Sequence, residues 1–100
     1  MRTDSATPKR AGGPLLLTDS AIGAAIRSRR GEVQQGEVAR RAGLNLSVYS
    51  RIERGERPCR VSEMVSIAKA LNTPEDEMLK LIREQVAEQE AVKRLRKSDG

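Results

Sequence analysis

Residues 35–55, QGEVARRAGLNLSVYSRIERG, decide the fold of this chain. Two short helical patterns in this stretch flank the turn Ala42-Gly43-Leu44-Asn45. Gly43 suits a backbone position with positive φ, where a Cβ atom would cost about 1 kcal/mol or more. Leu44 can then fold under the turn and pack between both helices. Two short helices joined by a short turn that contains glycine predict a helix-turn-helix.

Apolar residues recur at helical spacing along the rest of the chain, and no segment shows the alternation typical of a strand. Start and stop signals place five helices, at about residues 19–30, 34–42, 46–54, 61–71 and 74–97. Their inward faces carry the expected core: Ile22, Ala25, Ile26, Val38, Ala39, Ala42, Tyr49, Ile52, Met64, Val65, Ile67, Ala68, Leu71, Met78, Leu79 and Ile82. The sequence therefore predicts an all-α fold.

Capping signals mark the starts of four of the helices. Asn45 can cap the third helix directly after the turn, and Thr73 can cap the fifth, with Pro74 at its first position. Glu37 follows Gln34 by three residues, as in a capping box at the start of the second helix. Thr18 or Asp19 would be the N-cap of the first helix.

The composition excludes several classes of protein. The 100 residues include no His, one Cys and one aromatic residue, Tyr49. Zinc fingers, disulfide frameworks and His-based catalysis are therefore excluded, and stacking platforms for single-stranded nucleic acid are not expected. No apolar run is long enough for a membrane helix or a signal peptide. We expect one small cytoplasmic domain with no metal or cofactor, and no enzyme, because nothing resembles a nucleophile elbow or a phosphate loop.

The net charge of +5 is unevenly distributed. Residues 1–60 carry 12 Lys and Arg against 6 Asp and Glu, whereas residues 61–100 carry 7 against 8. Eleven of the first 12 cations are arginine, which suits phosphates and guanine edges. Charge that served solubility alone would be spread evenly, so the asymmetry favours a nucleic-acid partner.

Three segments follow from these patterns. Residues 1–17 are rich in Thr, Ser, Pro and Gly and indicate a flexible basic arm. The arm carries Lys9 and Arg10, and a disordered tail explains its composition nearly as well as a functional arm does. Residues 18–83 form the expected DNA-binding domain, and residues 84–100 extend its last helix.

Residues 22–82 resemble the lambda-repressor-like (Cro/cI, or XRE) family of helix-turn-helix proteins. The resemblance rests on four segments in order: Ile26-Arg27-Ser28-Arg29-Arg30, Gln35 to Leu44, Ser50-Arg51-Ile52-Glu53-Arg54-Gly55 and Ile67-Ala68-Lys69-Ala70-Leu71. The family implies a five-helix domain that binds double-stranded DNA with its third helix in the major groove.

The resemblance assigns one role to the start of the second helix and another to the start of the third. Gln35 opens the second helix, where a side chain and the helix N-terminus meet a phosphate. Asn45, Leu46 and Ser47 lie at the N-terminal end of the recognition helix. Leu46 departs from the polar residue often found at a base-reading position, so a thymine methyl contact and a protein contact both stay open.

Further along the recognition helix, Arg51 shares the outward face of Ser47. A guanine contact and a phosphate contact are equally compatible with Arg51, and Ser50 is a weaker candidate on the same surface. The resemblance implies phosphate contacts for Arg54 and Arg57. The N-terminal arm is similar to the extended arms that some phage repressors wrap around DNA, which implies that Lys9 and Arg10 could reach the DNA backbone or minor groove.

The family also implies a structural ion pair between the end of the first helix and the third. Arg30 and Glu53 occupy these positions. We expect loss of either partner to look like misfolding. Cys59, between two cations, admits a reactive thiol, but a small packed loop residue is favoured.

The predicted function is a sequence-specific transcriptional regulator, with a repressor favoured, that binds a palindromic operator as a homodimer. An antitoxin of a toxin–antitoxin pair and a phage adaptor protein are the alternatives. Beyond residue 83 the last helix carries a thin, broken apolar stripe: Val86, Ala87, Ala91, Val92 and Leu95. This stripe is compatible with a contact to another protein chain and with a solvated helix, and the resemblance to a family that dimerises favours a dimer contact.

Overall fold

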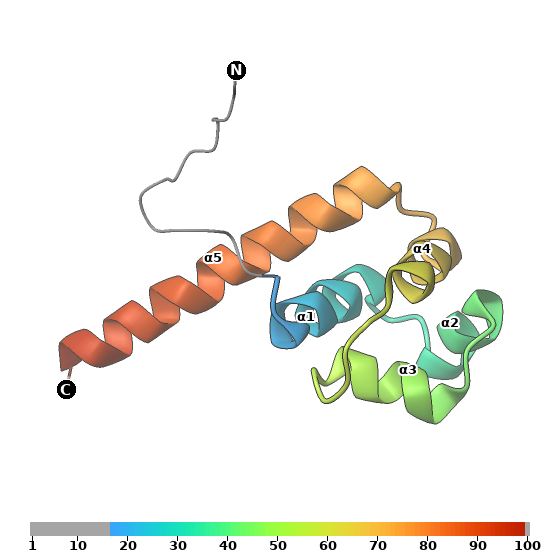
Figure 1. Ribbon diagram of the computed structural model, residues 1–100, viewed down its shortest axis with the longest axis horizontal. Helices are drawn as coiled ribbons and strands as arrows, with labels where there is room; N and C mark the ends of the chain where they lie inside the picture. The colour runs from blue at the N-terminus through green and yellow to red at the C-terminus, as the bar shows by residue number, and fades with distance from the viewer. Residues whose placement is uncertain (1–16, 100) are drawn as a thin grey trace, which may run out of the picture.

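A computed structural model of the protein describes residues 17–99 (Figure 1). These residues form five helices and no strand: α1 (Asp19–Arg30), α2 (Gln35–Ala42), α3 (Leu46–Glu53), α4 (Val61–Ala70) and α5 (Glu75–Asp99). The predicted all-α class is confirmed, and the helix bounds lie close to those expected from the sequence.

Both ends of α1 are fixed by local hydrogen bonds. The Thr18 hydroxyl accepts a hydrogen bond from the backbone N of Ala21 at 3.1 Å, so Thr18, rather than Asp19, is the N-cap. At the other end, Gly31 N donates to the carbonyl oxygen of Arg27 at 3.2 Å. Because Arg30 is the last residue of α1, its side chain leaves the helix beside α3.

The core lies around α1, which packs against α3 on one side and α5 on the other, while α2 packs against α4 (Figure 1). It comprises Ala21, Ala25, Ile26, Val38, Ala39, Tyr49, Ile52, Ile67, Ala68, Ala70, Met78, Ile82 and Val86. Leu79 was expected inside but is 39% exposed. The buried positions of α5 are four residues apart at Met78, Ile82 and Val86, and Leu79 lies off that stripe.

Glycine allows α1 to rest directly on the C-terminal end of α3. A Cβ atom at Gly23 would lie 2.3 Å from the carbonyl oxygen of Glu53 and 2.5 Å from that of Ile52. A Cβ atom at Gly55 would lie 2.9 Å from the Cα of Ser20, and Gly55 also has φ +72°. The two glycines therefore fix the position of α3 against α1.

The capping box expected at the start of α2 is wrong. Gln34 is the N-cap residue and makes no side-chain capping bond. The Glu37 carboxylate instead accepts hydrogen bonds from Arg40 Nη2 at 2.6 Å and Arg41 Nε at 2.9 Å. Arginines three and four residues further along the same helix face compete successfully for this carboxylate.

Thr73 does not act as the expected cap of α5, which begins at Glu75 after Pro74. The Thr73 side chain is buried, and its hydroxyl accepts from Arg29 Nε at 2.7 Å and donates to the carbonyl oxygen of Leu71 at 3.0 Å. The prediction failed because α1 supplies a partner for this hydroxyl from across the fold.

The C-terminal part of α5 continues beyond the packed core (Figure 1). Val92 is 45% exposed and Leu95 is 67% exposed there. A shallow groove of about 640 Å³ runs between this part of α5 and α1, and Gln89 Nε2 donates to Ser20 Oγ across it at 3.1 Å. Each described helix, including α5, is too short or too polar to cross a lipid bilayer.

Candidate nucleic-acid interface

The turn between α2 and α3 has the geometry that its sequence predicts. Gly43 adopts a left-handed conformation with φ 71° and ψ 29°. Leu44 N donates to the carbonyl oxygen of Ala39 at 2.9 Å, and the Leu44 side chain packs against the core. Asn45 Oδ1 accepts from Ser47 N at 2.9 Å and so caps α3. The two helices and this turn form a helix-turn-helix.

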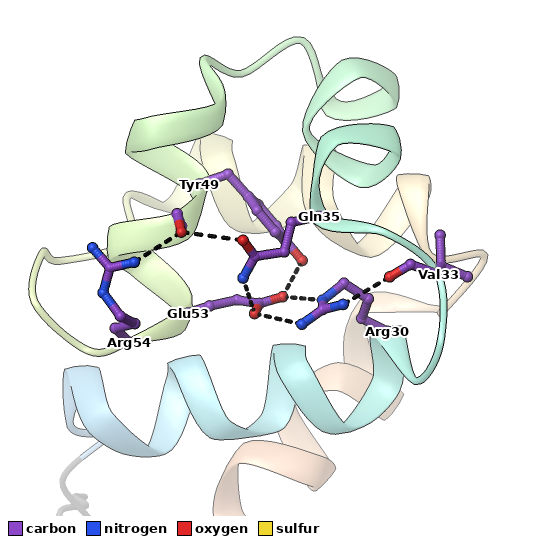
Figure 2. Close-up of polar contacts among 7 residues, drawn as sticks. Arg30, Val33, Gln35, Tyr49, Glu53 and Arg54 are labelled. Carbon is purple, nitrogen blue, oxygen red and sulfur yellow. Dashed lines mark hydrogen bonds and ion pairs between the residues drawn. The ribbon is translucent and has the colours of Figure 1, made fainter.

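The inner face of α3 is held by a buried carboxylate. Glu53 is 2% exposed, and its side chain accepts hydrogen bonds from three helices (Figure 2). Arg30 of α1 binds it through Nε at 2.5 Å and Nη2 at 3.0 Å. The Tyr49 hydroxyl donates to it at 2.5 Å, and Gln35 Nε2 donates at 2.7 Å. Arg30 and Glu53 thus form an ion pair that ties α1 to α3, while Gln35 adds α2.

The pKa values of this cluster follow from its hydrogen bonds. Burial alone would raise the pKa of Glu53, but the hydrogen bonds from Arg30, Tyr49 and Gln35 outweigh it and lower that pKa. Burial, followed by the hydrogen bond to Glu53, raises the pKa of Tyr49 well above its ordinary value. The hydrogen bond to Glu53 likewise raises the pKa of Arg30. At neutral pH, Glu53 is therefore ionised and Tyr49 is a neutral donor.

The outer face of α3 is exposed to solvent. Four of the predicted DNA-contacting residues lie at this surface: Asn45, Leu46, Ser47 and Arg51. The Leu46 side chain is 51% exposed although it is apolar. Arg51 forms no ion pair within the part of the chain that the structure describes. Its guanidinium therefore keeps its donors for a ligand.

Gln35 and Ser50 lie at the boundary between the two faces, and both are half-buried. Ser50 Oγ donates to Gln35 Oε1 at 3.1 Å, while the other end of the Gln35 amide binds Glu53. The structure brings these side chains together with each other. Their predicted contacts with DNA stay predictions.

Arg54 and Arg57, the two expected phosphate contacts, both have acidic partners. Arg54 donates to the Glu56 carboxylate through Nε at 3.0 Å and Nη2 at 3.1 Å. Arg57 donates to Glu63 through Nη1 at 2.9 Å and Nη2 at 3.0 Å. The Arg54 pair is exposed, whereas the Arg57 pair is largely covered. A phosphate must compete with a carboxylate at either site.

Sequence reasoning missed Glu56 and Glu63 as partners of these arginines, and it missed the bond of Tyr49 to Glu53. For Glu63, the sequence did carry a signal of a structural role at the start of α4, because Glu63 stands three residues after Arg60, the N-cap of that helix. Glu63 Oε1 accepts from Arg60 N at 2.9 Å, which is one half of a capping box. No comparable spacing rule marked Glu56.

The surroundings of Cys59 support its favoured interpretation as a small packed loop residue. The side chain is half-buried and packs against the core. Burial and, to a smaller extent, Glu63 raise the pKa of Cys59 to about 11, against the opposing effect of Arg57.

The predicted arm contacts Lys9 and Arg10 lie outside the described residues. Among those residues, no group of three or more His, Cys, Asp or Glu is placed to hold a metal ion.

A family model described as a helix-turn-helix domain matches residues 21–81. The chain belongs to this family. The match covers α2, α3 and the turn between them, together with most of α1, all of α4 and the first part of α5. None of the curated proteins compared matches the sequence.

Solved structures with the same fold are regulators. The clp gene regulator ClgR from Corynebacterium glutamicum is 27% identical, with a TM-score of 0.76 over 91% of this chain and 93% of that chain. A second ClgR crystal structure is 29% identical, with a TM-score of 0.62 over 67% and 88%. The restriction-modification controller protein C.AhdI from Aeromonas hydrophila is 26% identical, with a TM-score of 0.57 over 60% and 94%. This helix-turn-helix protein therefore has the lambda-repressor-like fold of DNA-binding transcriptional regulators.

Proposed function

We propose that this helix-turn-helix protein is a transcriptional repressor that binds a palindromic operator in double-stranded DNA as a homodimer. The exposed outer face of α3 is the observation that carries the proposal. Ser47 and Arg51, one helical turn apart on that face, are exposed, while Glu53 on the opposite face is buried and fully paired. A helix held firmly on one side and free on the other suits insertion into the major groove.

We assign the base contacts to the first turns of α3. Arg51 presents a fork of donors that fits guanine O6 and N7, and Leu46 fits a thymine methyl group. Asn45 caps α3 through Oδ1 and keeps the donors of Nδ2 for a base or phosphate. We assign Gln35, at the boundary of this face, and Arg54 and Arg57, which follow α3 in the chain, to phosphates, which set the register of the helix. On DNA, Arg54 would exchange the exposed carboxylate of Glu56 for a phosphate.

We assign dimerisation to the C-terminal part of α5. The exposed side chains of Val92 and Leu95, three residues apart on the same helix, support this assignment because they would be buried in a contact between two α5 helices. Two subunits would present their α3 helices to successive major grooves, about 34 Å apart. The match of the family model to residues 21–81 supports a DNA-binding domain at 18–83 and a separate extension at 84–100.

The known relatives support a regulatory role, since ClgR regulates clp genes and C.AhdI controls a restriction-modification system. The proposed mechanism of repression is occlusion of RNA polymerase by the protein bound at its operator. The proposed site of action is the cytoplasm, where the operator would be found, and the proposed activity is binding without catalysis.

Selection of bound sequences from random duplexes tests the proposal. We expect a palindrome whose half-sites are about one helical turn apart. Affinity should fall steeply with salt, and each phosphate contact should contribute about 0.9 to the negative slope of log K against log salt. The absence of enrichment at low salt would contradict DNA recognition. An enriched single half-site bound by a monomer would contradict dimerisation and favour another partner for α5.

A further inference from the structure

The Ser50 hydroxyl lies between two side chains that the proposed function assigns to phosphates. Ser50 Oγ is 3.1 Å from Gln35 Oε1 and 2.9 Å from Arg54 Nη1. Gln35 in turn reaches the buried Glu53 carboxylate through Nε2 at 2.7 Å. A chain of hydrogen bonds thus runs from the interior of the protein to an exposed guanidinium (Figure 2).

The direction of every bond in this chain is determined by chemistry. The Glu53 carboxylate only accepts, because its pKa is lowered, so the Gln35 amide must turn its NH₂ group toward it. Gln35 Oε1 therefore faces Ser50 and can only accept, which makes the Ser50 hydroxyl the donor. Arg54 has only donors, so it donates to the remaining side of the same hydroxyl.

This arrangement leaves Ser50 poorly suited to contact DNA itself. A serine hydroxyl has one hydrogen, and that hydrogen is engaged with Gln35. It has nothing left to donate to a phosphate oxygen or to an acceptor on a base edge. Arg54 keeps two of its five N–H donors after its bonds to Ser50 and Glu56. The free donors for a phosphate are on Arg54.

We propose that Ser50 is a positioning residue, whose hydroxyl fixes Arg54 and Gln35 relative to each other. Because Gln35 is bonded to buried Glu53, the position of the Glu53 carboxylate also determines the orientation of Arg54 at the phosphate-facing surface. The proposal rests on the proposed function, because it takes the outer side of α3 as the DNA surface. It assigns Ser50 no base contact, whereas the sequence makes Ser50 a weaker candidate for DNA contact on the same surface as Arg51.

A double-mutant cycle tests the coupling. Duplex affinities are measured for the wild type, Ser50→Ala, Arg54→Ala and the double variant, on the selected operator and on a random duplex, at several salt concentrations. We expect Arg54→Ala to weaken both duplexes about tenfold, and Ser50→Ala to weaken both about threefold to tenfold. Each should reduce the salt slope by up to about 0.9. The double variant should be no weaker than Arg54→Ala alone.

Two matched variants complete the design. Ser50→Thr keeps the hydroxyl and should restore most of the affinity and slope lost in Ser50→Ala. Ser66→Ala removes a serine hydroxyl that donates to a carbonyl oxygen within α4 and should change neither quantity. In the free protein, the NMR signals of the Arg54 Nε–H and the Gln35 side-chain amide should shift in Ser50→Ala.

Three results would overturn the proposal. A changed base preference in Ser50→Ala would make Ser50 a reader of sequence, and multiplicative losses in the double variant would show that Ser50 and Arg54 act independently. Unchanged Arg54 and Gln35 signals in the free Ser50→Ala variant would exclude the hydrogen-bond chain without any use of DNA. If these signals shift but the wild type binds no duplex at low salt, the proposed function fails and the positioning role fails with it.

Discussion

The two faces of α3 differ in whether their charged side chains are bonded within the protein. On the inner face, the Glu53 carboxylate is covered and bonded to Arg30, Tyr49 and Gln35. On the outer face, Arg51 is exposed and has no ion-pair partner among the described residues. Arg30 of α1 therefore stabilises the fold through Glu53, while Arg51 of α3 is available to a ligand.

The same contrast refines the meaning of the basic N-terminal charge. Five of its arginines form ion pairs within the described structure: Arg30, Arg40, Arg41, Arg54 and Arg57. The charge excess marks the half of the chain that binds DNA in our proposal. Whether an arginine in that half is exposed and without an acidic partner, rather than its charge alone, indicates whether it is free to bind DNA.

The largest expected effect is loss of the inner carboxylate. Glu53→Ala leaves Arg30, Tyr49 and Gln35 without their acceptor, and it should lower the free energy of unfolding by about 3–5 kcal/mol. Urea denaturation followed by circular dichroism measures this loss. Arg51→Ala, on the outer face, is the matched control and should stay within about 0.5 kcal/mol of the wild type. Equal stabilities for the two variants would remove the distinction between the faces.

The next effect concerns the contact that positions α3. Gly23→Ala should destabilise by about 1–3 kcal/mol, because its Cβ atom would meet the carbonyl oxygens of Glu53 and Ile52 and force α1 away from α3. Gly36→Ala is the control, since no atom lies within 4 Å of a Cβ atom there. Its stability should be unchanged or about 0.5–1 kcal/mol higher. An unchanged or higher stability in both variants would show that helix propensity, rather than close packing, governs Gly23.

The inner face should also respond to acid. Since the folded-state pKa of Glu53 is lowered, its ionised form stabilises the fold above the unfolded pKa of about 4.3, and that stabilisation is lost as the pH falls through the folded pKa. Glu37, Glu56 and Glu63 also have lowered pKa values, through their arginine partners, and contribute to the same decline. Between pH 6 and pH 3, Glu53→Gln should therefore lose less stability than the wild type, as measured by unfolding at each pH. Parallel pH profiles would contradict this role of Glu53.

The smallest expected effect is at the edge of the outer face. Glu56→Gln weakens the hold on Arg54 and removes a negative charge near the proposed phosphate, so affinity for operator and random duplexes alike should rise about twofold. Fluorescence anisotropy at moderate salt is sensitive enough to detect it. Glu84→Gln, an exposed acid on α5, should change nothing. Weaker binding by Glu56→Gln would indicate that the Arg54–Glu56 pair orients Arg54 for its contact.

The helix-turn-helix could be predicted from sequence because its determinants are local. Gly43 and Asn45 act through their own backbone and neighbouring amides, so their types identify the turn and the cap. Glu37 and Thr73 failed as capping residues because their polar groups found other partners. For Glu37 these were arginines of the same helix, and for Thr73 the partner was Arg29, 44 residues away.

The candidate site was predictable in part for the same reason. Exposure of Ser47 and Arg51 follows from helical periodicity once Tyr49 and Ile52 are placed inside. The partnerships of Gln35 with Glu53 and Ser50 depend on how closely α2 packs on α3, which no spacing rule expresses. Periodicity therefore predicts which residues face outward, and only packing determines which polar groups stay free.

The most direct test of the division between the two faces is to select bound duplexes with Arg51→Ala alongside the wild type, and to measure the unfolding free energy of both. We predict that the wild type selects a palindrome and that the variant loses about tenfold of its discrimination at one base pair in each half-site. Its stability should be unchanged. Selection of the same motif by the variant, or equal weakening on selected and random duplexes, would contradict the assignment of base reading to the outer face of α3.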